Sequence, residues 1–81
     1  MYVTVKILFF GATAEIVGTR EIFVKEIAQS KASKLIEKVI GDYPKLASGK
    51  LLFSVNQQHA TGDEIIRDGD EVAIFTAVSG G

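Results

Sequence analysis

One amphipathic helical stripe stands between two groups of strand-like segments, and this order limits the chain to few folds. Apolar residues recur at steps of three and four over 32–43, as one face of a helix requires. Ser30 precedes the stripe as an N-cap, where its side chain would accept a backbone N–H, and Gly41 and Pro44 limit the helix. The apolar stripe consists of Ala32, Leu35, Ile36, Val39, Ile40 and Tyr43.

The segments around this helix are rich in β-branched and aromatic residues, which is typical of strands. Between the first two strands, Gly11–Gly18 has room for about two helical turns. After the helix, residues 45–50 are expected as a loop or short helical turn, and 57–63 as a polar turn. Asp68-Gly69-Asp70 is a strong turn signal. The expected strands are 2–10, 20–25, 51–56, a brief one at 64–67, and 71–78.

This order predicts an α+β fold, in which one main helix covers one face of a mixed sheet. It does not by itself distinguish among the small α+β folds. The 81 residues contain no repeat or linker, so we expect one domain over 1–78 and a flexible tail at 79–81. The tail ends in Gly80 and Gly81.

Composition excludes several classes of function. The chain has no cysteine, which excludes disulfides, cysteine nucleophiles and Cys-rich metal sites. The net charge is −1 and Lys and Arg are scattered, so no nucleic-acid partner is expected. No apolar run is long enough to span a membrane, and Met1 leads directly into a strand pattern without a signal peptide. We therefore expect a cytoplasmic protein with no membrane partner.

The polar residues indicate no catalytic or metal site. His59 is the only histidine and lies in a polar segment, which is typical of a solvated loop residue. The acidic residues of 63–71 alternate with turn glycines and are interpreted as turns and a solvated edge. No glycine spacing matches a phosphate-binding loop. We expect this chain to bind no metal, nucleotide or cofactor.

Two aromatic residues stand on the less apolar faces of their strands. Phe10 shares a face with Thr4 and Lys6, and Phe75 shares a face with Glu71. Large aromatic side chains on such a face predict an exposed apolar patch, which often marks an interface. Phe10 and Phe75 are therefore candidates for binding a partner, although either side chain could instead cap the edge of the core.

Longer stretches of the chain resemble a known family. VKILFFGATAEIVG, SVNQ and RDGDEVAIFTAVSGG, with the terminal Gly-Gly, are similar to the small subunit of molybdopterin synthase (MoaD-type). More broadly they resemble the β-grasp sulfur carriers, which include the carrier of the thiamine pathway. The resemblance spans essentially the whole chain and implies a ubiquitin-like β-grasp fold.

The resemblance also implies a chemistry. An ATP-dependent adenylyltransferase similar to ubiquitin-activating enzymes would adenylate the Gly81 carboxylate, and a sulfur donor protein would convert it to a thiocarboxylate. The larger synthase subunit would receive Gly80 and Gly81 in its active site and contact Val78 and Ser79 beside them. Sulfur would then pass to a cyclic pyranopterin precursor of the molybdenum or tungsten cofactor, in a heterotetramer. This chain would be a sulfur-donating subunit, with the catalytic pocket mainly on its partner.

Three other functions remain open from the sequence. The chain could carry sulfur for thiamine or another thio-cofactor. It could be a protein modifier that forms isopeptide bonds to lysines through Gly81, as ubiquitin does. It could also be an interaction module with an inert tail. The fate of the terminal carboxylate distinguishes these functions.

Overall fold

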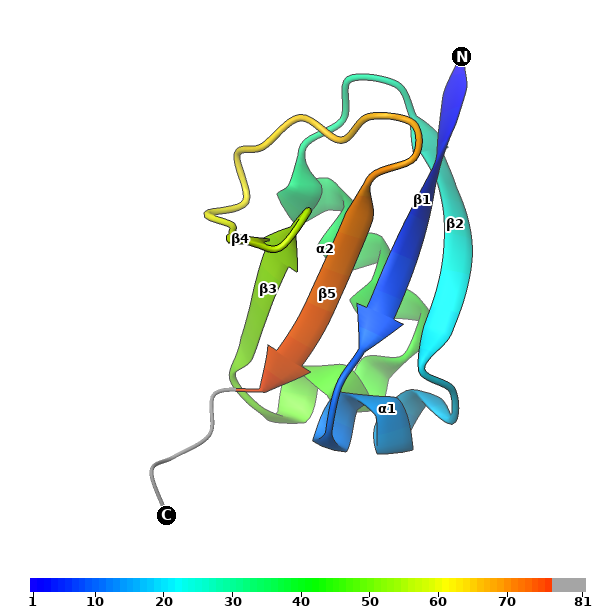
Figure 1. Cartoon of the computed structure of the whole chain (residues 1–81). Helices are drawn as coiled ribbons and strands as arrows, with labels where there is room; N and C mark the ends of the chain where they lie inside the picture. Colours follow the sequence, from blue (N-terminus) through cyan, green and yellow to red (C-terminus); the bar gives the residue numbers. More distant parts are fainter. Residues whose placement is uncertain (77–81) are drawn as a thin grey trace.

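In the computed structural model of the chain, residues 1–76 are described, apart from the side chain of Ser48. A five-stranded mixed sheet has the strand order β2-β1-β5-β3-β4 (Figure 1). The central pair, β1 and β5, is parallel, and the other neighbouring strands are antiparallel. The strands are β1 (Tyr2–Phe9), β2 (Glu21–Ile27), β3 (Leu51–Val55), β4 (Gln58–His59) and β5 (Glu71–Thr76).

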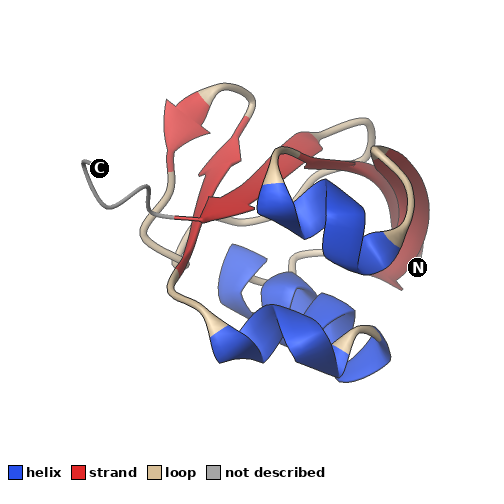
Figure 2. Ribbon diagram, turned by 90° about the horizontal axis from the view of Figure 1, so that it is seen from below, coloured by secondary structure: helices blue, strands red, loops and turns tan. Residues whose placement is uncertain are grey.

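The helices lie on one side of the sheet, as the view along its layers shows (Figure 2). The main helix is α2 (Ala32–Asp42), followed by a 3₁₀ helix, η1 (Pro44–Ser48). A short helix, α1 (Ala12–Val17), connects β1 to β2 and ends at Gly18 in the left-handed conformation. The predicted α+β arrangement, with one main helix on a mixed sheet, is confirmed for the described residues. The predicted domain end at 78 and the tail at 79–81 lie outside them.

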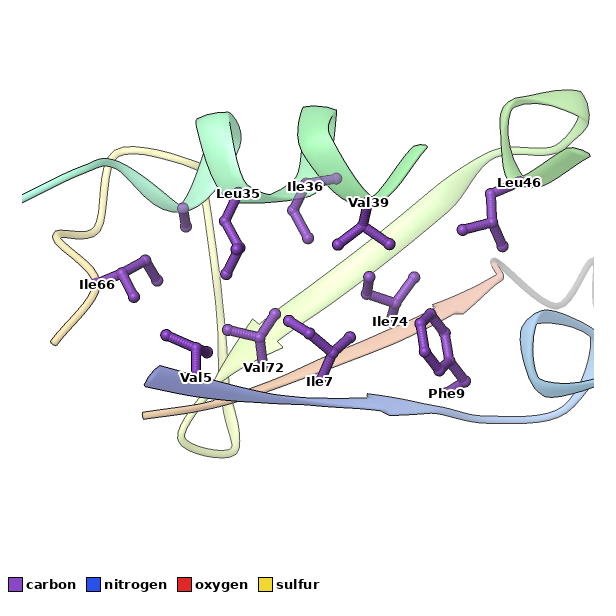
Figure 3. Close-up of a cluster of buried hydrophobic side chains, with 11 residues drawn as sticks. Val5, Ile7, Phe9, Leu35, Ile36, Val39, Leu46, Ile66, Val72 and Ile74 are labelled. Atoms are coloured by element: carbon purple, nitrogen blue, oxygen red, sulfur yellow. The ribbon is translucent and has the colours of Figure 1, made fainter. Parts of the chain in front are cut away.

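Apolar side chains from both layers form one core (Figure 3). Alternate residues of β1 and β5 point toward α2, and the predicted stripe of α2 points back at them. Each such side chain contributes about 1.5–3 kcal/mol on burial. Leu46 of η1 and Ile66 close the two ends of this core, which the periodicity of the main helix did not predict. The cluster consists of Val5, Ile7, Phe9, Ala32, Leu35, Ile36, Val39, Leu46, Ile66, Val72 and Ile74.

The predicted N-cap of the main helix is wrong. Lys31, not Ser30, is the N-cap residue of α2, and no side chain caps the helix. Backbone carbonyls of a distant segment accept the first N–H groups instead: Ala32 donates to Glu64 and Ser33 donates to Gly62. Gly62 has a φ of 108°, and a Cβ there would lie 3.3 Å from Ser33 Cβ, so glycine permits this close approach.

The limits of several elements differ from the prediction. Helix α2 continues through Gly41 to Asp42, and Pro44 begins the 3₁₀ helix, so only the proline limits the helix. Strand β1 ends at Phe9, while β2 extends to Ile27. The strand predicted at 64–67 is wrong, because this segment pairs through one isolated bridge between Lys31 and Ile65.

The polar segment after β3 forms a tight hairpin rather than a long turn. Asn56 and Gln57 both have positive φ, at 50° and 69°, as a two-residue hairpin turn requires. Gln58 and His59 then pair with Val55 and Ser54. The Asn56 amide accepts the Glu71 N–H and donates to Asp70, with both distances 3.0 Å, so the hairpin is tied to the start of β5.

Candidate functional site

Strand β5, the last strand of the described residues, lies in the middle of the sheet. It lies between β1 and β3, with Ile74 opposite Phe9 and Thr76 opposite Leu51. Residues 77–81 follow directly after this strand. Any group that acts at the chain end is therefore attached to a strand that is hydrogen-bonded on both sides.

A buried hydroxyl secures this end of the sheet. Thr13 of α1 is fully buried, and its Oγ1 lies 2.8 Å from the Phe10 carbonyl and 2.9 Å from the Ile74 carbonyl. The same oxygen accepts the Phe10 N–H at 3.0 Å. The hydroxyl has one proton, which the two carbonyls share. Thr13 thus fixes α1 against both central strands, close to the last described residues.

Near the hydrogen bonds of Thr13, apolar side chains lie together on the outer face of the sheet, which is the face away from α2. Cross-strand pairing places Leu8 opposite Ala73 and Leu52 opposite Phe75. Directly opposed residues point to the same face of a sheet, and this face alternates with the buried positions of β1 and β5. We call this surface the β5 patch and define it as Leu8, Phe10, Leu52, Ala73 and Phe75.

The two aromatic residues singled out in the sequence both belong to the β5 patch. Phe10 follows the end of β1, is 52% exposed, and donates its N–H to the Ile74 carbonyl at 3.2 Å. Phe75 is only partly exposed, because it packs beside Leu52 on the neighbouring strand. Sequence reasoning missed Leu52 as a site residue, although the alternation of Leu52 and Ser54 in β3 could have placed it on this face. Val78, Ser79, Gly80 and Gly81 lie outside the described residues.

A shallow groove of about 850 Å³ adjoins the β5 patch at Leu8 and Phe10. It runs between the end of β1 and helix α1 and reaches Thr19 and Arg20 at the start of β2. Its lining is mainly apolar, with Glu15 and Arg20 as the charged members. The groove extends the apolar surface of the β5 patch toward helix α1.

The other half of the outer face is polar and differs in character from the β5 patch. Lys6 forms an ion pair with Glu21 at 3.5 Å, and its ammonium lies 5.9 Å from the centroid of the Phe23 ring. Such an exposed ion pair stabilises the fold by about 0–1 kcal/mol. Phe23 is 63% exposed, and its exposure was not predicted.

Outside this region, the described residues offer little chemistry. No group of three or more His, Asp or Glu side chains within residues 1–76 could hold a metal ion. His59 is exposed in β4, in agreement with its interpretation as a solvated residue. Glu64 accepts the N–H groups of Thr61 and Gly62, each at 2.8 Å, and these bonds, that of Thr61 foremost, lower the pKa of its carboxyl group. Among the described helices, none has the length and apolar content to cross a bilayer.

Comparison with known proteins identifies relatives across nearly the whole chain. Residues 7–81 match the model of the ThiS family. The chain is 37% identical to the molybdopterin synthase sulfur carrier subunit of Escherichia coli, over 95% of this chain and 99% of that protein. It is 32% identical to the human protein of the same name, over 95% of this chain and 93% of the relative.

Solved structures agree with the fold. SAMP1 from Haloferax volcanii superimposes with a TM-score of 0.85 and 25% identity, over 96% of this chain and 99% of the other. A chain from the Helicobacter pylori complex of subunits 1 and 2 of molybdopterin-converting factor has a TM-score of 0.67 and 18% identity, with coverage of 96% and 99%. The latter likeness is one of fold. The expected ubiquitin-like β-grasp architecture is confirmed by these structural neighbours.

Proposed function

Because the chain belongs to the ThiS family, we propose that it is a sulfur carrier protein and that it serves as the small subunit of a molybdopterin synthase. The observation that carries this proposal is the near full-length identity of 37% and 32% to two relatives named as molybdopterin synthase sulfur carrier subunits. The position of β5 supports it, since this strand, which precedes residues 77–81, forms part of an apolar surface.

We propose Gly81 as the residue that carries sulfur. The chain has no cysteine, so sulfur has to be held on another group. A carboxylate is a poor electrophile, and adenylation with release of pyrophosphate supplies a good leaving group. A sulfur nucleophile then displaces AMP and leaves a thiocarboxylate. Gly80 and Gly81 lack Cβ atoms, which suits passage of the chain through a narrow channel of a partner.

The β5 patch is proposed as the surface that binds the larger synthase subunit. Phe75 lies on the strand that leads to the chain end and Phe10 lies beside that strand, so docking there would direct Val78–Gly81 into the partner. The partly exposed apolar side chains would be desolvated at the centre of the interface, where binding energy is concentrated. In this arrangement the partner supplies the catalytic pocket and this chain supplies the reacting group.

The further components follow from the same chemistry. An ATP-dependent adenylyltransferase would activate Gly81, and a sulfur donor protein would provide the sulfur. ATP would be used by that activating enzyme, and this chain would bind no cofactor of its own. A heterotetramer with two larger subunits in the cytoplasm, with a cyclic pyranopterin as sulfur acceptor, is part of the proposal.

Reconstitution of sulfur transfer tests the proposal. Thiocarboxylated protein would be mixed with the larger subunit of a molybdopterin synthase and the cyclic pyranopterin precursor, and molybdopterin formation would be measured. We expect product with the full chain and none with a variant that lacks Gly81. Product formation by the truncated variant, or its absence with the thiocarboxylated full chain, would overturn the assignment to molybdopterin synthesis.

Protein modification is the second candidate function. The 25% identity and TM-score of 0.85 to SAMP1 from Haloferax volcanii favour it, because SAMP1 is small archaeal modifier protein 1. A modifier would use the same activated carboxylate but pass it to a lysine amine. Isopeptide-linked Gly81 on other proteins, identified by peptide mass spectrometry, would distinguish this function from sulfur carriage.

A further inference from the structure

Strand β2 is the long free edge of the sheet. It has seven residues, whereas β4 at the opposite edge has two. An exposed edge strand presents unpaired backbone groups to which another strand can bind, and proteins usually cover or charge such edges. The hydrogen bonds along β2 therefore indicate where this edge is closed and where it is open.

The pairing with β1 determines which backbone groups face outward. Phe9 donates to the Arg20 carbonyl and Ala28 donates to the Met1 carbonyl, so the even-numbered residues of β2 are the ones bonded to β1. In an antiparallel pair the intervening residues direct their N–H and carbonyl groups away from the partner strand. These outward residues are Glu21, Phe23, Lys25 and Ile27.

Local groups occupy part of this edge, whereas the outward N–H groups of Glu21 and Lys25 have no partner within residues 1–76. At the end of β2, the Ile27 N–H is bonded to the Glu26 carboxylate at 2.9 Å, and the Ile27 carbonyl accepts the Ser30 N–H. The Lys38 ammonium donates to the Lys25 carbonyl at 2.8 Å. At the start of β2, the Thr19 hydroxyl lies 3.4 Å from the Glu21 carbonyl.

Phe23 is the outward residue of β2 whose two backbone groups are both unbonded in the part of the chain that the structure describes. Within residues 1–76, neither its N–H nor its carbonyl has a hydrogen-bond partner. Its side chain is 63% exposed on the outer face. An open backbone position that also carries an exposed aromatic ring is suited to accept a strand opposite Phe23.

We propose that two copies of this chain pair antiparallel through β2, about a twofold axis at Phe23. In this register Phe23 lies opposite Phe23 of the second copy and exchanges both of its open hydrogen bonds with it. Glu21 then lies opposite Lys25, and the twofold axis repeats this pair. Ile22 lies opposite Val24, and Arg20 lies opposite Glu26. Each charged residue thus has an opposite charge as its partner, which is the self-complementarity that an isologous interface requires.

The locally bonded groups of this edge are compatible with this pairing. A carbonyl oxygen has two lone pairs, so the Lys25 and Glu21 carbonyls can accept a bond from the second copy beside the local one. The β5 patch begins on β1, where Leu8 lies opposite Glu21, and its other strand residues lie further from the edge on β5 and β3. Pairing through the edge of β2 therefore leaves Leu52, Ala73 and Phe75 of the β5 patch uncovered in each copy.

Charge exchange tests the register. Sedimentation equilibrium over a concentration series would measure dimerisation of the parent chain, of Glu21→Lys, of Lys25→Glu, and of the double variant. Each single variant places like charges opposite each other twice, and we expect dimerisation to weaken about tenfold or more. The double variant, and an equimolar mixture of the two single variants, restore opposite charges and should dimerise again. Lys50→Glu, an exposed charge change next to β3 and away from β2, should leave dimerisation unchanged.

Amide hydrogen exchange gives a second readout that does not depend on substitution. The proposal expects the Phe23 amide to become protected as the protein concentration rises, while the capped Ile27 amide changes little. A parent chain that stays monomeric to about 1 mM, or one whose dimer is equally stable in both single variants, overturns the proposal. Circular dichroism of each variant establishes that a loss of dimer is not a loss of fold.

Discussion

The Thr13 hydroxyl lies 2.9 Å from the carbonyl of Ile74, a residue 61 positions further along the chain. Helix α1 is thereby bonded to the strand that leads to the chain end. The Thr13 side chain is fully buried, and the Ile74 carbonyl that it contacts belongs to the backbone of β5. It links the local turn after β1 to the position of the candidate site.

Replacing Thr13 with valine should destabilise the protein. Valine keeps the shape of the side chain but removes the buried hydroxyl bonds to Phe10 and Ile74, whose backbone groups then keep only their backbone partners, at a cost of about 1–3 kcal/mol. Urea denaturation followed by circular dichroism measures this change. Thr13→Ser retains the hydroxyl and should lose less stability than the valine variant. A valine variant as stable as the parent would show that the hydrogen bonds of the Thr13 hydroxyl contribute nothing to stability.

Replacing Phe75 with alanine should weaken binding of the larger synthase subunit while leaving folding largely intact. Phe75 lies on the outer face and is partly exposed, so its truncation removes an interface contact rather than the centre of the core. A loss of about tenfold or more in affinity is expected for a central aromatic anchor. Isothermal titration calorimetry against the larger subunit gives the affinity.

Tyr2→Ala is the matched control, because Tyr2 is an exposed aromatic residue of the same sheet face outside the β5 patch. It should bind the larger subunit with parent affinity. Unfolding of Phe75→Ala, or affinity equal to that of the parent, would contradict the interface assignment.

Replacing Asn56 with alanine should destabilise the hairpin between β3 and β4. Asn56 has a positive φ, and its amide bonds both Glu71 and Asp70. Loss of these bonds and strain on alanine are expected to cost about 1–2 kcal/mol. Asn56→Gly accepts the positive φ but lacks the side-chain amide. Its melting temperature should lie between those of Asn56→Ala and the parent. Equal melting temperatures for all three proteins would contradict this role.

Glu64 should add a pH-dependent component to stability. Hydrogen bonds from the Thr61 and Gly62 N–H groups lower the pKa of its carboxyl group below the ordinary 4.5. A group whose pKa is lower in the folded state stabilises the fold above its unfolded pKa, and this stabilisation is lost as pH falls through the folded pKa. Glu64→Gln should therefore be less stable than the parent at pH 7, with a difference that shrinks below about pH 4.5.

Thermal melts of the parent and Glu64→Gln across this pH range provide the measurement. Asp63→Asn is the control, because the only partner of the Asp63 carboxylate within residues 1–76 is Lys31, in a surface ion pair at 3.7 Å. A constant difference between the parent and Glu64→Gln at every pH would contradict the proposed bonds.

Sequence periodicity was sufficient to predict the two layers of this fold, but not the distant groups that cap helix α2. The alternation in β1 and β5 and the stripe from Ala32 to Val39 predicted the two faces of the core, because burial imposes these periods directly. Ser30 was assigned as the helix cap from local preference alone. The carbonyls of Gly62 and Glu64 perform this task, and no local pattern reveals groups that come from 30 residues away.

The candidate site was predictable to a similar extent. The strand period placed Phe10 and Phe75 on the outer face. The structure brings them together with Leu52 through the antiparallel pairing of β3 with β5, and with Leu8 through the parallel pairing of β1 with β5. This pairing joins the two ends of the chain and could not be read from either segment alone. The open position at Phe23 also depends on tertiary structure, because it is defined by which neighbouring backbone groups are capped.

Mass analysis of Gly81 tests the central claim most directly. The protein would be incubated with a matching adenylyltransferase, ATP and a sulfur source, and its C-terminal peptide would be sequenced by mass spectrometry. The peptide assignment is essential because oxidation of Met1 gives nearly the same mass change as exchange of oxygen for sulfur. A thiocarboxylate on Gly81, absent from a Gly81-deleted control, is the predicted result. An unmodified Gly81, or one joined only to lysines, would contradict sulfur carriage.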